Sequence, residues 1–413
     1  MKQLVILDPG LKELSGHHPA SIEAIVNALD VSLDALNHPR ISVYCHKEIS
    51  TSYVEQKRQQ GVEVNAHFST EYYQYFYQSP TRQQLIHYTL NLASEYYQAI
   101  LKAVENKDAG STVIWCHTLG WQHAQALYLA LSNAHQTVST SKLRPYRVIV
   151  GLMYHPLSRL PKLEPEVITR KMHHELALKR LSSLSSVQLL AADFEIQDYY
   201  QRLLKRPIDI QPCLLLGQES KLQRQCWQHS KNQVLLFTGD AKPDKGFTQL
   251  PDLIRSVVPN CPEQQFIVQY TLTNQSSSLA SIESQLKQLS NTYSNLTLVD
   301  RFLEHQELMT LFQTSETIVL NYDSETYQYQ SSGVLWLAAF FDLKVITLTK
   351  NWLEREAKRL ISEVTYCEKK TEIVTSITKK LSLYKNEKKF GNTGHYKKFL
   401  FAPLNSWLHS QFD

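Results

Sequence analysis

The chain is poor in cysteine and has no cysteine motif. Its 413 residues include six cysteines, which are scattered and form no CxxC pair. They stand at positions 45, 116, 213, 226, 261 and 367. Disulfide frameworks and structural zinc sites need paired cysteines, so this spacing predicts reduced, mostly buried thiols in a cytoplasmic protein. The opening segment MKQLVILDPG has too short an apolar run for a signal peptide and predicts a first strand instead.

The sequence also lacks long apolar runs and a strong charge of either sign. No stretch approaches the roughly 20 apolar residues that span a bilayer, so any membrane attachment is expected to be peripheral. The net charge of +4 is small, and no RNA-binding signature or sustained basic run accompanies it. Nucleic acid is therefore not an expected partner. Apolar content of 43% and charged content of 20% are ordinary for a soluble globular protein.

Several catalytic motifs are absent. The chain has no GxSxG and no GxxxxGK[ST], which argues against the nucleophile elbow of a serine hydrolase and against a P-loop. It also has no Asp-x-Asp motif, so the sequence does not call for a divalent metal. We predict neither a metal nor a cofactor. Glycine is sparse, with 12 residues, so those at sites of expected loops stand out. They are the glycines at positions 10, 16, 239, 246 and 333.

Apolar, β-branched runs alternate with helical periodicity in both halves of the chain. In the first half they predict strands at 4–7, 41–45, 62–68, 113–116, 147–153, 187–190 and 208–216. In the second half they predict strands at 234–237, 266–270, 296–299, 317–320 and 344–348. This alternation predicts an α/β protein with two doubly wound, Rossmann-like domains facing a central cleft. The expected divisions are 1–216, a linker at 217–231, 232–388, and a tail at 389–413 that packs toward the first domain.

The segment 317–348 is the most informative stretch. A buried strand is followed by a polar, aromatic loop, and Ser331, Ser332 and Gly333 then stand directly before an apolar helix. Loops at the carboxyl ends of parallel strands bind ligands in open α/β sheets, and a helix start presents free N–H groups to an anion. A phosphate suits such a site. The alternative is an ordinary serine cap on a core helix.

Two motifs in this half resemble those of a known family. The first is Tyr322-Asp323, Tyr327, Ser331-Ser332-Gly333, Ala338 and Val345, and the second is the run 233–247 with Gly239 and Lys245-Gly246. In this order they resemble the nucleotide-sugar segments of family 4-like glycosyltransferases with the GT-B fold. The resemblance implies a donor site formed by Gly239, Lys242, Gly246, Tyr322, Asp323, Tyr327, Ser331, Ser332, Gly333 and Val334.

Two positions depart from the pattern of that family. Leu337 stands where an acidic residue commonly holds the donor, and Asp240 stands where an arginine commonly pairs with the diphosphate, with Lys242 two residues on. Lysine supplies charge but not a bidentate fork. The alternative interpretation is therefore a catalytically degenerate GT-B protein that acts as a binding or partner subunit.

Histidines mark the strand ends of the first domain. The resembled family places a histidine after the later strand, beside the donor sugar, so His155 and Lys245 are the expected catalytic residues. The loop with Gly16, His17 and His18 is expected to face the cleft, together with His117, which follows an earlier strand. The alternative, which the sequence favours equally, is that His17 and His18 are exposed loop residues. A metal site there is not expected, since no acidic or cysteine partner is spaced nearby.

Two further stretches have a functional and a structural interpretation. The run EYYQYFY at 71–77 could stack on a sugar ring, but packing under a loop is favoured. The predicted helix 165–184 lies in a region with several basic residues, which indicate a solvated face or contact with an anionic membrane. The basic residues are Lys162, Arg170, Lys171, Lys179 and Arg180.

Together these features predict a hexosyltransferase-like enzyme of polysaccharide biosynthesis. It would move a sugar from a nucleotide sugar to a glycan or lipid-linked acceptor, in the cytoplasm or at the inner face of the membrane. The resemblance implies retention of the anomeric configuration without a metal or a covalent protein nucleophile. A two-domain extracytoplasmic binding protein is a third interpretation, which the missing signal peptide and unpaired cysteines argue against.

Overall fold

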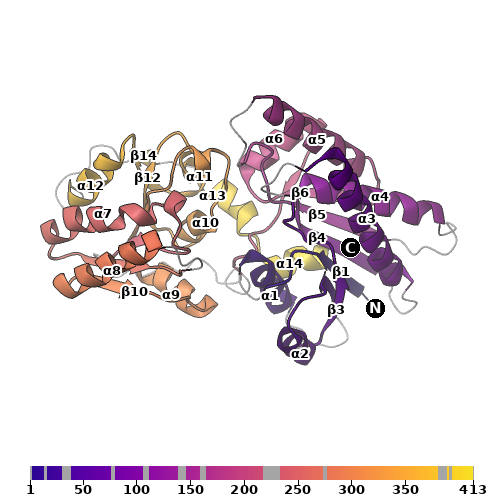
Figure 1. Ribbon diagram of the computed structural model, residues 1–413, viewed down its shortest axis with the longest axis horizontal. Helices are drawn as coiled ribbons and strands as arrows, with labels where there is room; N and C mark the ends of the chain where they lie inside the picture. Colours follow the sequence, from indigo (N-terminus) through magenta and orange to yellow (C-terminus); the bar gives the residue numbers. More distant parts are fainter. Residues whose placement is uncertain are drawn as a thin grey trace. The chain divides into compact units, whose positions relative to one another are not determined.

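The computed structural model describes residues 2–13, 16–29, 39–75, 80–105, 111–137, 146–158, 164–216, 233–272, 277–379, 388–389 and 393–412. It divides into two compact units, each with its own sheet. Unit 1 is residues 1–222 with 399–413, and unit 2 is residues 223–398 (Figure 1). The returning tail begins at 399 rather than at 389, and the predicted linker lies outside the described residues.

Unit 1 contains a seven-stranded parallel sheet in the order β3-β2-β1-β4-β5-β6-β7. Its strands are β1 (Lys2–Asp8), β2 (Arg40–His46), β3 (Val62–Phe68), β4 (Ser111–Leu119), β5 (Tyr146–Leu152), β6 (Val187–Ala191) and β7 (Asp209–Ile210). Its helices are α1 (His17–Leu29), α2 (Thr51–Gln59), α3 (Arg82–Val104), α4 (Trp121–Thr137), α5 (Glu164–Ser182), α6 (Phe194–Leu204) and α14 (Leu404–Ser410).

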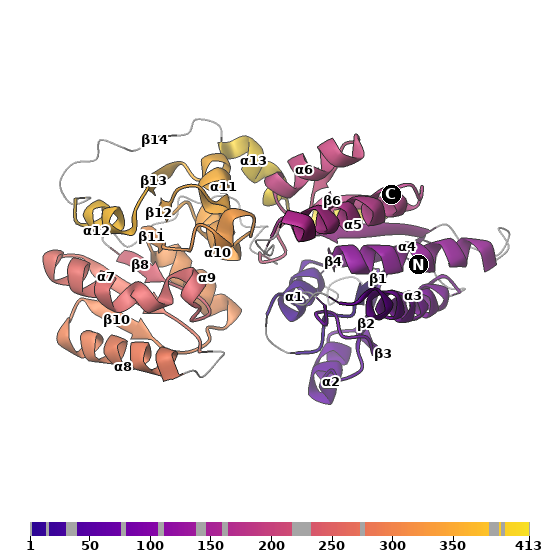
Figure 2. The same cartoon turned by 45° about the horizontal axis from the view of Figure 1, so that its top comes forward.

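Unit 2 repeats the plan in the order β10-β9-β8-β11-β12-β13-β14, with only β14 antiparallel. Its strands are β8 (Gln233–Phe237), β9 (Gln265–Gln269), β10 (Leu296–Val299), β11 (Thr317–Leu320), β12 (Lys344–Leu348), β13 (Glu363–Cys367) and β14 (Lys388–Lys389). Its helices are α7 (Leu250–Val257), α8 (Ser277–Thr292), α9 (His305–Thr314), α10 (Gly333–Phe340), α11 (Trp352–Leu360), α12 (Lys370–Lys379) and α13 (Thr393–Leu400). Figure 2 shows α7 alongside α8 here, and α3 alongside α4 in unit 1.

The central strands of both sheets are buried along their length, which explains why they read as continuous apolar runs. Parallel sheets covered by helices on both faces need such runs. The tail adds to the core of unit 1, where Leu404 and Leu408 of α14 pack in the same cluster as α1. The ring of Trp407 lies 5.3 Å from that of Trp115 on β4. The five described cysteines are free and buried.

Several sequence expectations fail in detail. The strand predicted at 208–216 contracts to β7, because Pro212 cannot donate to a strand ladder. His117 does not follow β4 but lies within it, beside a register shift between Cys116 and Leu119. No helix in the described part of the chain combines the length and apolar character needed to cross a membrane.

Candidate functional site

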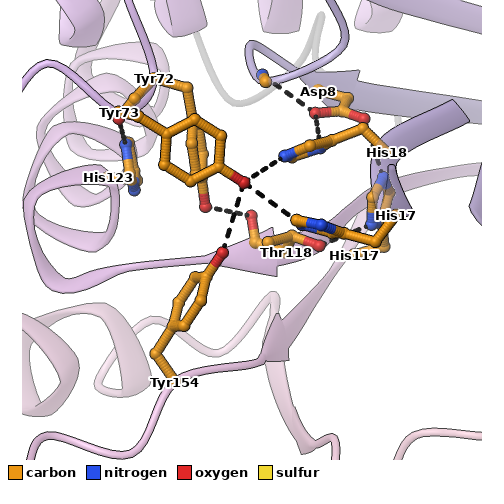
Figure 3. A network of polar contacts seen from close by, with 10 residues as sticks. Asp8, His17, His18, Tyr72, Tyr73, His117, Thr118, His123 and Tyr154 are labelled. Carbon is orange, nitrogen blue, oxygen red and sulfur yellow. Dashed lines mark hydrogen bonds and ion pairs between the residues drawn. The ribbon is translucent and has the colours of Figure 1, made fainter. Parts of the chain in front are cut away.

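Unit 1 brings polar side chains together at the switch point of its sheet. β1 and β4 are neighbours, and the chain leaves them toward opposite edges of the sheet, which is where such sheets bind ligands. Asp8 ends β1, His117 lies near the end of β4, and His18 stands in the first turn of α1. Figure 3 shows these three side chains converging, although Asp8 and His117 are 109 residues apart in sequence.

Asp8 holds two imidazoles at once. Its Oδ1 lies 2.8 Å from His18 Nδ1, and its Oδ2 lies 3.0 Å from His117 Nε2. The Gly10 N–H donates to Oδ1 at 3.0 Å. Burial by itself raises the pKa of a carboxyl, but the charges and hydrogen bonds of His18 and His117 hold the pKa of Asp8 well below its usual range. The carboxylate is therefore ionised, and a ring nitrogen of each histidine faces it.

The second nitrogen of His18 reaches a tyrosine. Its Nε2 lies 2.8 Å from the hydroxyl of Tyr73, which is also 3.3 Å from His17 Nε2 and 3.5 Å from the hydroxyl of Tyr154 (Figure 3). The tautomer of His18 decides which of these two atoms donates: with its proton on Nδ1, the nitrogen that faces Asp8, Nε2 accepts from the Tyr73 hydroxyl. Asp8, His18 and Tyr73 thus form a continuous polar chain, with an ion-pair contact of 2.8 Å between Asp8 and His18 and a hydrogen bond of 2.8 Å between His18 and Tyr73.

The expectation that no acidic side chain accompanies these histidines is wrong, because Asp8 contacts His18 and His117. The ligand atoms of the three lie within 4.8 Å of one another. Ligand atoms around a tetrahedral zinc stand about 3.3 Å apart, given bonds of about 2.0 Å. The contacts of Asp8 with His18 and His117, at 2.8 and 3.0 Å, are shorter than that separation, as in a network of ion pairs and hydrogen bonds.

The loop histidines are not simply exposed. His18 is buried and His17 half-buried, while Gly16 is exposed with a φ of 93° that favours glycine. The exposed-loop alternative is therefore wrong for His18. Burial lowers the pKa of His17 to about 3, with the neighbouring His18 and His117 adding to the effect.

His155 follows β5 and is buried. Its Nδ1 accepts the Leu157 N–H at 3.2 Å, and its ring meets that of Tyr199 on α6 at 4.7 Å. These contacts stabilise the strand-end loop, and a catalytic role for His155 stays a prediction. The adjacent residue, Tyr154, is the one whose hydroxyl reaches Tyr73. Sequence reasoning named neither Tyr73 nor Tyr154 as a site residue.

Unit 2 repeats the arrangement at β8 and β11. The loop after β8 contains Gly239 with a φ of 110° and Gly246 with a φ of 85°. A Cβ on Gly246 would lie 2.3 Å from the carbonyl oxygen of Asn321, directly after β11. Close by, the N–H of Asp323 donates to the carbonyl of Asp244 at 2.8 Å. The two motif segments, 233–247 and the loop after β11, are therefore in contact, and Gly246 permits that contact.

The two lysines of the segment 233–247 differ. Lys242 pairs with Asp240 at 2.9 Å in a partly exposed ion pair. Asp240, which stands where the resembled family commonly has an arginine, therefore balances the charge of Lys242. Lys245 is more deeply placed, and burial lowers the pKa of its ammonium. Its Nζ lies 3.3 Å from the position that a Cβ on Gly239 would take. An anion bound here would relieve that desolvation by pairing with Lys245.

The start of α10 is not closed by a serine side chain. Ser332 is the N-cap, with extended backbone, but its side chain makes no capping hydrogen bond. Its hydroxyl instead donates to the Tyr322 hydroxyl at 3.5 Å. The alternative of an ordinary serine cap is therefore wrong: the Ser332 hydroxyl caps none of the first N–H groups of the helix, and the Ser332 carbonyl accepts the Leu335 N–H at 3.1 Å. Ser331, Gly333 and Val334 are half-buried beside it.

The loop before α10 is held by its own side chains. Tyr322 and Tyr327 are buried with ring centres 4.6 Å apart, and burial raises the pKa of Tyr322 to about 12. Asp323 Oδ1 accepts the Thr326 N–H at 2.8 Å, and this bond lowers the pKa of the Asp323 carboxyl. Leu337 is buried in the core, so the family's acidic position is filled here by an apolar packing residue.

Two histidines with a lowered pKa predict a loss of stability in mild acid. Burial lowers the pKa of His123, as of His17, to about 3, whereas an unfolded histidine titrates near 6.5. Between these values the unfolded state binds more protons, so the free energy of unfolding falls as pH falls from about 6.5, by up to about 1.4 kcal/mol per pH unit for each group. Urea unfolding at pH 7 to 4.5 measures this. His123→Gln should reduce the slope, and a flat profile in the parent protein would contradict the account.

No model of a protein family matches the sequence, and no curated protein matches it either. Solved structures do match its fold along the whole chain. α,α-Trehalose 6-phosphate synthase from Burkholderia multivorans is 11% identical with a TM-score of 0.59, covering 100% of this chain and 98% of its own. The E. coli trehalose-6-phosphate structure bound with UDP-2-fluoro glucose is 10% identical with a TM-score of 0.54, covering 100% and 96%.

Sucrose-phosphate synthase from Thermosynechococcus elongatus is similar at 12% identity and a TM-score of 0.52, covering 100% of this chain and 95% of its own. At such identities the likeness shows the fold. The two parallel-sheet α/β domains are those of the GT-B fold, as the sequence predicted.

Proposed function

We propose that this protein is a glycosyltransferase that moves a hexosyl group from a nucleotide sugar to a glycan or lipid-linked acceptor. The observation that carries the proposal is the pair of polar switch-point sites on a fold shared, over the whole chain, with trehalose-phosphate and sucrose-phosphate synthases. One of those neighbours is bound with UDP-2-fluoro glucose, so UDP-glucose is the first donor to test.

The residues of unit 2 suit the leaving diphosphate. Sugar transfer develops negative charge on the departing phosphate, and preorganised donors stabilise it. The N–H groups at the start of α10 and the ammonium of Lys245 supply such donors, with the helix dipole adding to them. Gly333 leaves the helix start without a side chain in the way of the phosphate. No step of this scheme requires a metal ion, and it is compatible with retention of configuration.

The residues of unit 1 suit the acceptor. Asp8, His18 and Tyr73 form a relay that can accept the proton of an attacking hydroxyl: the sugar O–H breaks as a Tyr73 O–H forms, and the tyrosine proton passes to His18 Nε2. The imidazolium that results is stabilised by the buried Asp8 carboxylate. In this scheme Tyr73 is the catalytic residue, and Asp8 acts through His18.

Peripheral contact with a membrane, which a lipid-linked acceptor would need, is a further part of the proposal. Its place would be α5, where Lys171 and Arg180 accompany the half-exposed side chains of Met172 and Leu176. Lys179 pairs with Glu175 on the same helix at 2.5 Å, as on an ordinary solvated face.

Replacing Lys245 by alanine tests the donor site. We expect affinity for UDP to fall about tenfold or more, since a charge-assisted contact to phosphate contributes roughly 1.5–3 kcal/mol. Isothermal titration with UDP, GDP and ADP measures the affinity. Lys287→Ala is the matched control, because Lys287 pairs with Glu283 at 2.7 Å on the surface of α8.

Unchanged UDP affinity in folded Lys245→Ala would remove Lys245 from the site. If the parent chain binds none of the three nucleotides, the degenerate, non-catalytic alternative is favoured instead. A donor-hydrolysis assay with UDP-glucose then separates an active enzyme from a protein that only binds its nucleotide.

A further inference from the structure

A large cavity lies in unit 1 beside the segment that follows β3. Its volume is about 1110 Å³, and α3 forms one wall. This exceeds the roughly 300–1,000 Å³ of sites for drug-sized ligands, so it has room for more than one sugar ring. Tyr73 lines the cavity and also belongs to the network of Asp8 and His18. The residues that matter below are Tyr73, Tyr75, Tyr88, His87, Asn91 and Ser94.

The charges around the cavity do not suit a phosphate. The described residues that line it include two carboxylates, Glu71 and Glu95, and neither lysine nor arginine. Glu71 is paired with Lys12 at 2.5 Å. Glu95 accepts the N–H groups of Ser69 and Thr70 at 2.8 and 3.3 Å, so it is a structural part of the wall. The described lining therefore offers no lysine or arginine that could pair with an anionic ligand.

The uncharged lining groups suit a carbohydrate. His87, Asn91 and Ser94 follow one another at helical spacing and so share one face of α3. Amides, hydroxyls and imidazole both donate and accept hydrogen bonds, as sugar hydroxyls do. The half-buried ring of Tyr75 packs edge-on against Tyr88 at 5.5 Å, and the Gln74 amide donates to its hydroxyl at 3.2 Å. A fixed aromatic ring beside amide groups can hold the apolar face of a sugar and its polar rim.

We infer that this cavity binds an uncharged glycan and that the acceptor is therefore a neutral oligosaccharide rather than a sugar phosphate. That the bound glycan is the acceptor rests on the proposed function. Glycan binding itself can be measured without turnover. It also gives the aromatic run of the sequence two roles: Tyr72 is buried, and Tyr73 and Tyr75 line the cavity.

The test is isothermal titration of the full chain with maltotriose, cellotriose and chitotriose, and with glucose 6-phosphate for comparison. We expect at least one trisaccharide to bind and glucose 6-phosphate not to bind at this cavity. Tyr75→Ala and Asn91→Ala should each weaken trisaccharide binding about fivefold or more, by loss of a stacked ring or a hydrogen bond of about 1 kcal/mol. Tyr97→Ala and Gln98→Ala, on the same helix but outside the lining, are the matched controls.

The inference would be overturned if none of the three trisaccharides binds, or if the trisaccharide affinity is the same in Tyr75→Ala, Asn91→Ala and the controls. Glucose 6-phosphate binding that Tyr75→Ala abolishes would also overturn it. UDP titrated into the same samples checks folding and separates the two proposals. Glycan binding without UDP binding contradicts only the proposal that the protein is a glycosyltransferase. UDP binding without glycan binding contradicts only the inference that the cavity binds a glycan.

Discussion

Gly246→Ala is expected to lower the affinity for UDP by about 10²-fold or more. A side chain in the left-handed region costs roughly 1–2 kcal/mol, and Gly246 has a φ of 85°. The added Cβ would also lie 2.3 Å from the carbonyl oxygen of Asn321, a backbone atom that cannot turn aside. The loop that follows β11 must then move away from the loop of Lys245.

That movement separates the groups proposed to hold the diphosphate. Losing two charge-assisted contacts costs about 3 kcal/mol or more, which corresponds to the expected fall in affinity. Isothermal titration with UDP measures it, and a thermal melt reports the accompanying loss of stability. Gly394→Ala is the matched control, because a Cβ there would meet no atom of the described residues within 4 Å beyond its chain neighbours and its own helix backbone.

Should Gly246→Ala fail to fold, Gly239→Ala provides the same test more gently. Gly239 has a φ of 110°, but among the described residues an added Cβ would meet the end of the flexible Lys245 side chain, at 3.3 Å. Its UDP affinity should still fall, because Lys245 is displaced. Parent-like affinity in a folded Gly246→Ala protein would place the nucleotide elsewhere.

Asp8→Asn is expected to lower turnover by roughly 10²- to 10⁴-fold while leaving UDP affinity within a few-fold of the parent. Asparagine keeps the shape and can still accept from Gly10 and His18 through its oxygen. What it removes is the buried negative charge that would stabilise a protonated His18. The effects of removing general acid–base groups and their charged partners set the expected range.

The relay makes a prediction that a purely structural role does not. If Asp8 acts through His18 and Tyr73, Tyr73→Phe should lower turnover on a similar scale, and the double variant should fall little further than the worse single variant. Additive losses, or a fall that simply follows the melting temperature, would mean that Asp8 only stabilises the fold. His123→Gln is the control for a buried histidine of the same unit outside the relay.

Much of the unit 2 site could be predicted from local sequence. The strands at 317–320 and 344–348 have the predicted bounds, because buried parallel strands are continuous apolar runs. The Ser331–Gly333 helix start followed from the change to a helical pattern. The side-chain contacts did not follow. Nothing in a list of residues shows that Ser332 bonds to Tyr322 rather than capping α10, or that Asp240 pairs with Lys242.

The sequence by itself determined two α/β halves, each with a loop at the carboxyl end of its strands. Strands, helices and turns depend on patterns among residues close together in the chain, so they can be predicted from the sequence. Only the tertiary structure decided that β1 lies beside β4, and so that Asp8 meets a histidine 109 residues away and, through His18, Tyr73. The order of strands in a sheet depends on how the helices cover its two faces. Many apolar strands could take the same place in that arrangement. The pattern of one segment therefore does not identify its neighbour, and the Asp8 network exists only once the sheet has formed.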